Sequence, residues 1–141
     1  MNTPKKNVLI TGGSKGIGRS IVEEFLQKNY NVYSVSRSSP DLNHINFHPI
    51  IGDLLDSLFV QELSKKIENL NIDILVNNAG INIVNNFHEI SDFEKNQILT
   101  LNLQVPISLC QAVLRNMITQ EYGRIINISS IWGNVSRPKR V

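Results

Sequence analysis

A strand pattern gives way to a helix pattern across a glycine-rich turn near the start of the chain. Residues 8–11 (Val-Leu-Ile-Thr) form a short, apolar, β-branched run without helical periodicity, which predicts a buried strand. Gly12 and Gly13 interrupt this run. Beyond them, apolar side chains recur at helical spacing, at Ile17, Ile21, Val22, Phe25 and Leu26. The segment therefore predicts a strand, a tight turn and a helix.

The glycine-rich turn has the composition of a phosphate-binding turn. Backbone N–H groups at such a turn approach a phosphate closely, and the positive end of the helix dipole favours the anion. We expect Gly12 to supply the turn, Gly16 the close backbone approach, and Gly18 the tight packing of the helix on the strand. The spacing is G-x-x-x-G-x-G, which differs from the more common G-x-G-x-x-G of dinucleotide-binding turns.

Strand and helix patterns continue to alternate along the rest of the chain. Further strands are predicted at residues 31–36, 45–52, 72–76 and 124–130. A helix over residues 105–117 is expected to hold Pro106 in its first turn and to be closed by Gly123. This alternation predicts an α/β fold with a parallel sheet, formed as one domain over residues 1–141.

The intervening helices have recognisable starts. Asp56 or Ser57 is expected to cap the second helix, whose apolar stripe is Phe59, Leu63, Ile67 and Leu70. Ser91 and Glu94 form a capping box that begins a third helix. Asn102 is expected to end that helix.

Composition excludes several classes of protein. Arg137, Lys139 and Arg140 contribute three of the 14 basic residues, and the other 11 balance 12 acidic ones, which argues against nucleic-acid binding. The single cysteine, Cys110, cannot form a disulfide within the chain. The apolar run after the amino-terminal lysines is too short for a signal peptide or a membrane span, so we expect a cytoplasmic protein that binds no membrane.

A metal site is not expected. His44 and His48 lie four residues apart, a spacing that on a helix would allow both to ligate one metal ion. Here they flank a strand-like run that ends at Pro49, and no third ligand is clustered with them.

Four motifs together resemble the short-chain dehydrogenase/reductase family. They are Thr-Gly-Gly-Ser-Lys-Gly-Ile-Gly at residues 11–18, Asp53-Leu54, Asn77-Asn78-Ala79-Gly80, and Asn127-Ile128-Ser129-Ser130. The resemblance implies a three-layer, Rossmann-type, doubly wound parallel sheet, truncated after the fifth strand. It also implies a nicotinamide dinucleotide bound by the following residues: Gly12, Ser14, Lys15, Gly16, Ile17, Gly18, Arg37, Asp53, Leu54, Asn78, Ala79 and Gly80.

Two basic residues indicate NADP(H). In dinucleotide-binding folds an acidic residue at the end of the second strand accepts hydrogen bonds from the ribose of NAD, but here that position reads Ser36-Arg37. Arg37 can bind a 2′-phosphate through two charge-assisted hydrogen bonds, and Lys15 adds a second positive charge. The alternative is that both are solvated surface cations. Asp53 is expected, by resemblance, to accept a hydrogen bond from the adenine amino group; alternatively it only begins the next helix.

The resemblance also assigns two catalytic residues. Ser130, directly before Ile131-Trp132-Gly133, would bind and orient the substrate oxygen, whereas a serine outside this context would be a turn former. Asn102 would hold a water of the proton relay. The family's proton donor is a tyrosine followed four residues later by lysine, and none of the three tyrosines here has that companion.

The sequence therefore predicts an NADP(H)-dependent oxidoreductase that acts on a carbonyl or secondary alcohol, similar to 3-oxoacyl-acyl-carrier-protein reductases or related carbonyl reductases. Its substrate would be a small-molecule or carrier-linked carbonyl. The chain as given is expected to be inactive alone, and the complete enzyme to be a homo-oligomer. The alternative is a non-catalytic dinucleotide-binding or interaction module.

Overall fold

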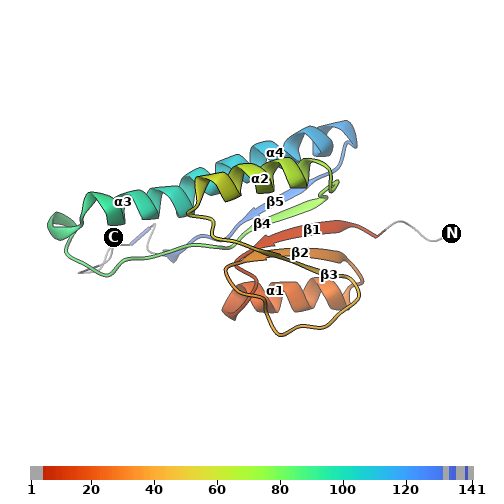
Figure 1. Ribbon diagram of the computed structural model, residues 1–141, viewed down its shortest axis with the longest axis horizontal. Helices are drawn as coiled ribbons and strands as arrows, with labels where there is room; N and C mark the ends of the chain where they lie inside the picture. Colours follow the sequence, from red (N-terminus) through yellow and green to blue (C-terminus); the bar gives the residue numbers. More distant parts are fainter. Residues whose placement is uncertain (1–4, 132–133, 136–138, 140–141) are drawn as a thin grey trace.

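A computed structural model describes residues 5–131, 134–135 and 139 (Figure 1). Trp132, Gly133, Arg137 and Arg140, named above, lie outside the described residues. The elements follow in the order β1 (Asn7–Thr11), α1 (Gly16–Gln27), β2 (Asn31–Ser36), β3 (Phe47–Ile51), α2 (Ser57–Glu68), β4 (Ile74–Asn77), the 3-10 turn η1 (Phe87–Glu89), α3 (Asp92–Leu99), the π-helical segment η2 (Thr100–Gln104), α4 (Val105–Thr119) and β5 (Arg124–Asn127).

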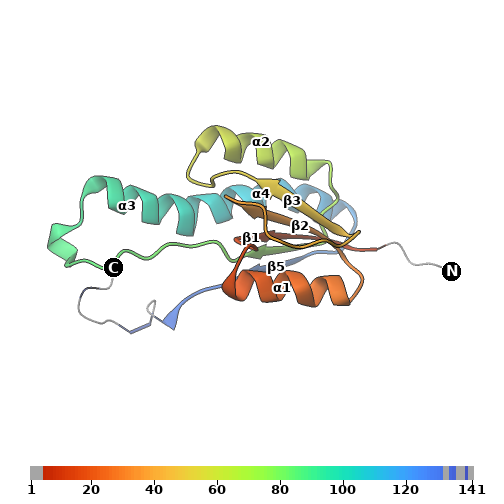
Figure 2. The same ribbon diagram turned by 60° about the horizontal axis from the view of Figure 1, so that its bottom comes forward.

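The strands form one parallel sheet with helices on both faces. Over the described residues the sheet has five strands in the order β3-β2-β1-β4-β5. Helix α1 covers one face, and α2 and α4 cover the other (Figure 2). The predicted three-layer, doubly wound α/β fold is confirmed. Because the winding reverses between β1 and β4, the carboxyl ends of these two strands open the crevice where such folds bind ligands.

Central strands are apolar on both sides because both sheet faces are covered. Val8, Leu9 and Ile10 of β1 are all fully buried, with Leu9 in the core beneath α2 and α4 and the other two in the core beneath α1. In contrast, β3 pairs only with β2, and Pro49 is tolerated there because an edge strand has one unpaired side. This strand is shorter than predicted, since Ile45 is 89% exposed in the preceding loop.

Two helical stripes differ from the sequence prediction. The buried face of α1 is formed by Gly18, Val22 and Leu26, whereas Ile17 is 67% exposed. Helix α2 is capped by Asp56, whose carboxylate accepts hydrogen bonds from the N–H groups of Leu58 and Phe59. Its buried residues are Val60, Leu63 and Ile67, with Phe59 and Leu70 only partly buried.

The prediction that Asn102 ends a helix is wrong. The chain stays helical from Asp92 to Thr119, passing through the π-helical segment that contains Asn102. Pro106 has no N–H to donate to the carbonyl four residues earlier, and its ring would crowd that carbonyl in a regular α-helix. The wider π turn accommodates it, with the Val105 N–H donating to Thr100 five residues back.

Gly123 does not close α4. The helix ends at Thr119, and the left-handed conformation that follows is taken by Glu121, with φ 53°. Gly123 instead lies against Met117, where an added Cβ would collide with the thioether. The glycine therefore serves close packing between the helix end and β5.

The helix from Asp92 to Thr119 is long and apolar enough to cross a membrane by length and composition, with a mean hydropathy of 1.3 over its most apolar window. One face of α4, the second half of this helix, is buried in the protein core. Val105, Leu109, Ala112, Val113 and Met117 are buried, and α4 packs against α2 and β4. This packing supports the expectation that the helix belongs to a sheet-covering layer.

Removing the cap of α2 tests this part of the fold. Asp56→Ala is expected to lower the free energy of unfolding by about 0.5–2 kcal/mol, because two N–H groups of the first turn lose their acceptor. Urea denaturation followed by circular dichroism measures the change. Ser57→Ala is the control, since Ser57 is the first helical residue, and an equal loss in this variant would contradict the assignment of the cap.

Candidate functional site

The glycine turn places the start of α1 at the carboxyl end of β1. Gly12 has φ 73° and donates its N–H to the Val35 carbonyl at 2.8 Å, which joins the turn to β2. Gly16 has φ 56°, and an added Cβ there would meet no atom within 4 Å, so its backbone borders open space. Lys15, the N-cap residue, makes no side-chain capping hydrogen bond. The geometry suits an anion at the helix start.

Two further glycines allow the helix to sit tightly on the sheet. A Cβ at Gly18 would collide with the Gly12 carbonyl and lie 2.5 Å from Nδ2 of Asn78, which confirms the predicted close packing. A Cβ at Gly13 would collide with Oγ of Ser34, a contact that the sequence analysis missed. In the sequence, only the consecutive glycines Gly12 and Gly13 signal this contact, and they do not identify Ser34 as the partner.

The paired asparagines join three strands, as their position at the end of an apolar strand predicts. Nδ2 of Asn78 donates to the carbonyls of Thr11 at 2.9 Å and Gly12 at 3.3 Å. Nδ2 of Asn77 donates to Oδ1 of Asn127 at 2.9 Å, across to β5. The Thr11 hydroxyl, not singled out from the sequence, accepts from the N–H groups of Asn78 and Ala79 at 3.0 and 2.9 Å.

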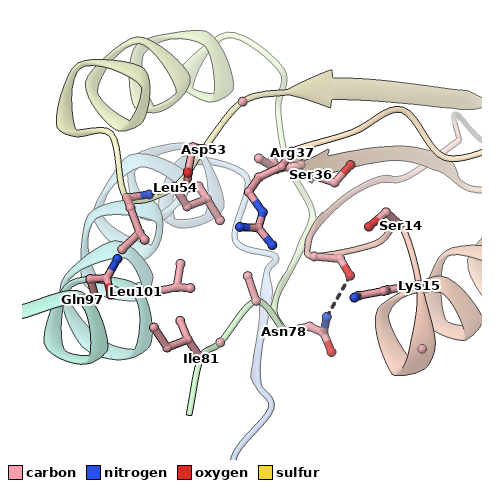
Figure 3. A pocket seen from close by; sticks show the side chains of 17 residues that line it. Ser14, Lys15, Ser36, Arg37, Asp53, Leu54, Asn78, Ile81, Gln97 and Leu101 are labelled. Carbon is pink, nitrogen blue, oxygen red and sulfur yellow. Dashed lines mark hydrogen bonds between the residues drawn. The ribbon is translucent and has the colours of Figure 1, made fainter. Parts of the chain in front are cut away.

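A cleft of about 560 Å³ opens above these strand ends (Figure 3). Lys15 and Arg37 enter it from different elements, the start of α1 and the end of β2. Asp53 lies on its rim, where Oδ1 accepts from the N–H of Leu55 at 3.0 Å. The predicted residues that line the cleft are Gly12, Ser14, Lys15, Gly16, Arg37, Asp53, Leu54, Asn78, Ala79 and Gly80. Ile17 and Gly18 do not line it.

Some residues of the cleft were not predicted. Val35, Ser36, Gly52, Leu55, Ile81, Gln97 and Leu101 also line it. Gln97 and Leu101 reach the cleft from the helix that begins at Asp92, on the side opposite α1 (Figure 3). Their position depends on the long-range packing of that helix, for which the sequence carries no local signal.

A second cleft, of about 900 Å³, is lined by both predicted catalytic residues. Ser130 and Asn102 both line it, as do Ile17 and Asn127. The side-chain amide of Asn102 is paired with the backbone of Ile81: Oδ1 accepts from its N–H at 2.9 Å, and Nδ2 donates to its carbonyl at 2.8 Å. The two clefts share Asn78, Ala79, Gly80 and Ile81, so they are contiguous.

The histidines have structural contacts. Nδ1 of His44 accepts from the Asn46 N–H at 3.1 Å, and the ring of His48 stacks on Tyr33 with centroids 4.8 Å apart. In the described part of the chain, no group of three or more His, Cys, Asp or Glu side chains lies close enough to hold a metal ion.

Displaced pKa values lie away from both clefts. Hydrogen bonds from the Ser91 hydroxyl and N–H lower the pKa of Glu94, in the predicted capping box. A hydrogen bond from Lys95, together with its charge, lowers the pKa of Asp92. Both interactions lie in the first turn of α3, where they support the start of the helix.

Known proteins resemble this chain in sequence and in fold. The sequence pattern of the short chain dehydrogenase family matches residues 6–141. The chain is 35% identical to a 3-oxoacyl-acyl-carrier-protein reductase of Haemophilus influenzae, over 94% of this chain and 58% of that protein. The corresponding reductase of Escherichia coli is 34% identical, over 96% of this chain and 59% of that protein.

Solved structures of related proteins have a similar fold. A 4-hydroxyisoleucine dehydrogenase complexed with NADH superposes with a TM-score of 0.88 at 28% identity, over 96% of this chain and 60% of that one. A short chain dehydrogenase from Leptospira borgpetersenii with bound NAD+ gives 0.84 at 32% identity, over 94% and 54%. The chain thus spans somewhat more than half the length of these relatives. With its family pattern matched from residue 6 to residue 141, the chain belongs to the short-chain dehydrogenase family.

Proposed function

We propose that the chain binds NADP(H) in the cleft lined by Lys15 and Arg37, and that it serves an oxidoreductase acting on a carbonyl or secondary alcohol. The observation that carries the proposal is the entry of these two cations into one cleft from α1 and β2. β2 ends at Ser36 and is followed by Arg37, so no carboxylate lies at this position to repel a 2′-phosphate. The two solved relatives named above hold NADH or NAD+, so the preference for a phosphorylated cofactor rests on these cations.

The remaining cleft residues fit a dinucleotide. The bound cofactor would supply or accept the hydride. The N–H groups at the start of α1 would hold the pyrophosphate, beside Gly12 and Gly16, whose positive φ angles favour glycine. The Asp53 carboxylate would accept from the adenine amino group at the rim. Ala79 and Gly80, shared by both clefts, would leave room for the ribose and nicotinamide.

The second cleft would hold the substrate oxygen. The Ser130 hydroxyl would donate a hydrogen bond to that oxygen and stabilise the negative charge that develops on it during hydride transfer. The side-chain amide of Asn102 is already paired with Ile81. A relay water would therefore bind the main-chain carbonyl of Asn102, to which Pro106 has no N–H to donate.

Substrate and assembly follow from the relatives and the surface. The curated relatives are reductases of acyl-carrier-protein substrates, which favours a carrier-linked carbonyl over a small ketone. A homo-oligomer would cover the apolar residues of α4 that are exposed outside both clefts, Leu114 and Ile118. We infer a cytoplasmic protein with no nucleic-acid or membrane partner.

A non-catalytic dinucleotide-binding module is the second candidate. One observation favours it: none of Tyr30, Tyr33 and Tyr122 is followed four residues later by lysine. Reading the gene beyond codon 141 discriminates between the two. A Tyr-x-x-x-Lys motif downstream supports the oxidoreductase, and a stop codon with no such remnant supports the module.

Reversing the charge of Arg37 tests the cofactor. Arg37→Asp is expected to weaken NADPH binding by about 1–3 kcal/mol, the range for a lost charge-assisted contact, and to leave NADH binding much less affected. Fluorescence titration of both cofactors measures the difference. Arg115→Asp, an exposed position on α4 outside both clefts, is the control for net charge. Equal affinities of the unaltered chain for NADPH and NADH would contradict the assignment.

The 141-residue chain is expected to reduce no ketone, because it contains no positioned tyrosine–lysine pair to protonate the developing alkoxide. NADPH oxidation with a 3-oxoacyl thioester, followed at its absorbance band, measures this. Turnover that Ser130→Ala abolishes and Ser129→Ala leaves intact would show that another residue donates the proton.

A further inference from the structure

The segment between β2 and β3 begins with Arg37 and passes over α1 before it returns to the sheet. Several contacts attach its first part, up to Leu42, to the rest of the protein. Oγ of Ser36 donates to the carbonyl of Ser38 at 2.8 Å, directly across Arg37. The Asp41 carbonyl accepts from Nη2 of Arg19 at 3.1 Å, and Leu42 packs against the core beneath α1. The backbone that carries Arg37 is therefore held on both sides.

Arg19 makes the hydrogen bond by which the helix of the phosphate-binding turn holds this segment. Its N–H bonds to the carbonyl of Lys15 at 3.3 Å, so it sits one helical turn after the other cation of the cleft. Its guanidinium spans two partners, with Nε on Oε1 of Glu23 at 2.6 Å and Nη2 on Asp41. A planar fork makes both contacts at once, which a lysine ammonium at this position would not reproduce.

Arg19 does not line the cleft, so any effect on the cofactor passes through another residue. We propose that Arg19 is a positioning residue for cofactor choice: by holding Asp41, it keeps Arg37 oriented toward the 2′-phosphate of NADPH. This inference rests on the proposed function. Its physical basis is preorganisation, because an arginine on a tethered segment loses less freedom when it binds phosphate.

The test uses the 141-residue chain and two probes that differ only in the 2′-phosphate, adenosine 2′,5′-bisphosphate and adenosine 5′-monophosphate. Calorimetric titration gives the ratio of their dissociation constants. Arg19→Gln is expected to reduce the preference for the bisphosphate by about two- to tenfold, the range for ordering one long side chain, with little change for the monophosphate. A purely structural role would weaken both probes equally.

Two variants separate positioning from charge. Glu23→Gln adds one unit of positive charge while it removes the carboxylate that steadies the Arg19 guanidinium. Positioning predicts a lower preference for the bisphosphate in this variant, whereas long-range attraction predicts a higher one. Lys28→Gln removes a cation from a similar i,i+4 pair, with Glu24 at 2.8 Å, and is expected to leave the preference unchanged.

Combining Arg19→Gln with Arg37→Gln distinguishes a failure of the proposed function from a failure of the positioning role of Arg19. In that background Arg19→Gln is expected to have no further effect on the preference. If Arg37→Gln alone leaves the preference unchanged, the proposed function is wrong. If Arg37→Gln lowers it but Arg19→Gln and Glu23→Gln do not, only the positioning role of Arg19 is overturned. Should circular dichroism show that Arg19→Gln is unfolded, Glu23→Gln, which retains the guanidinium, decides the question.

Discussion

The hydrogen bonds between Thr11 and the Asn78-Ala79 backbone hold the carboxyl ends of β1 and β4 together at the point where the sheet reverses its winding. Every part of the candidate site depends on this junction. The glycine turn leaves β1 directly after Thr11, and Gly18 of α1 rests on Gly12 and Asn78. The Thr11 hydroxyl is buried and accepts from two backbone N–H groups, which holds the two strand ends close together.

The sequence predicted best where burial or glycine geometry dominates. β1, β2 and β4 were recognisable because both sheet faces are covered, and Gly18 because a glycine in the first turn of a helix after a glycine-rich turn signals close packing. Predictions failed where one residue's effect depends on another. Asn102 was expected to end a helix, but Pro106 widens the turn and the helix continues. Ile17 was expected to be buried, but it lies in the first turn of α1, where it is exposed and lines the second cleft.

The two clefts are contiguous, so the groups that line them follow one another along a single continuous site. Asn78, Ala79, Gly80 and Ile81 form the shared wall, so a ligand long enough to fill both would lie across the end of β4. Arg37 lines one of the two clefts, and Ser130 lines the other. Ile81 also binds the side-chain amide of Asn102, so this wall is joined by two hydrogen bonds to the π-helical segment η2.

Pro49 makes the two borders of the sheet unequal. Gly52 donates its N–H to Ser36 of β2, and by the alternation of parallel strands the nitrogen of Pro49, three residues earlier, faces away from β2. Because the β3 border lacks a backbone N–H donor at its centre, a strand from another molecule cannot form a continuous ladder of hydrogen bonds along it. The β5 border, with Ile126 and Ile128 exposed, has no such block. An added strand would therefore pair more readily with β5 than with β3.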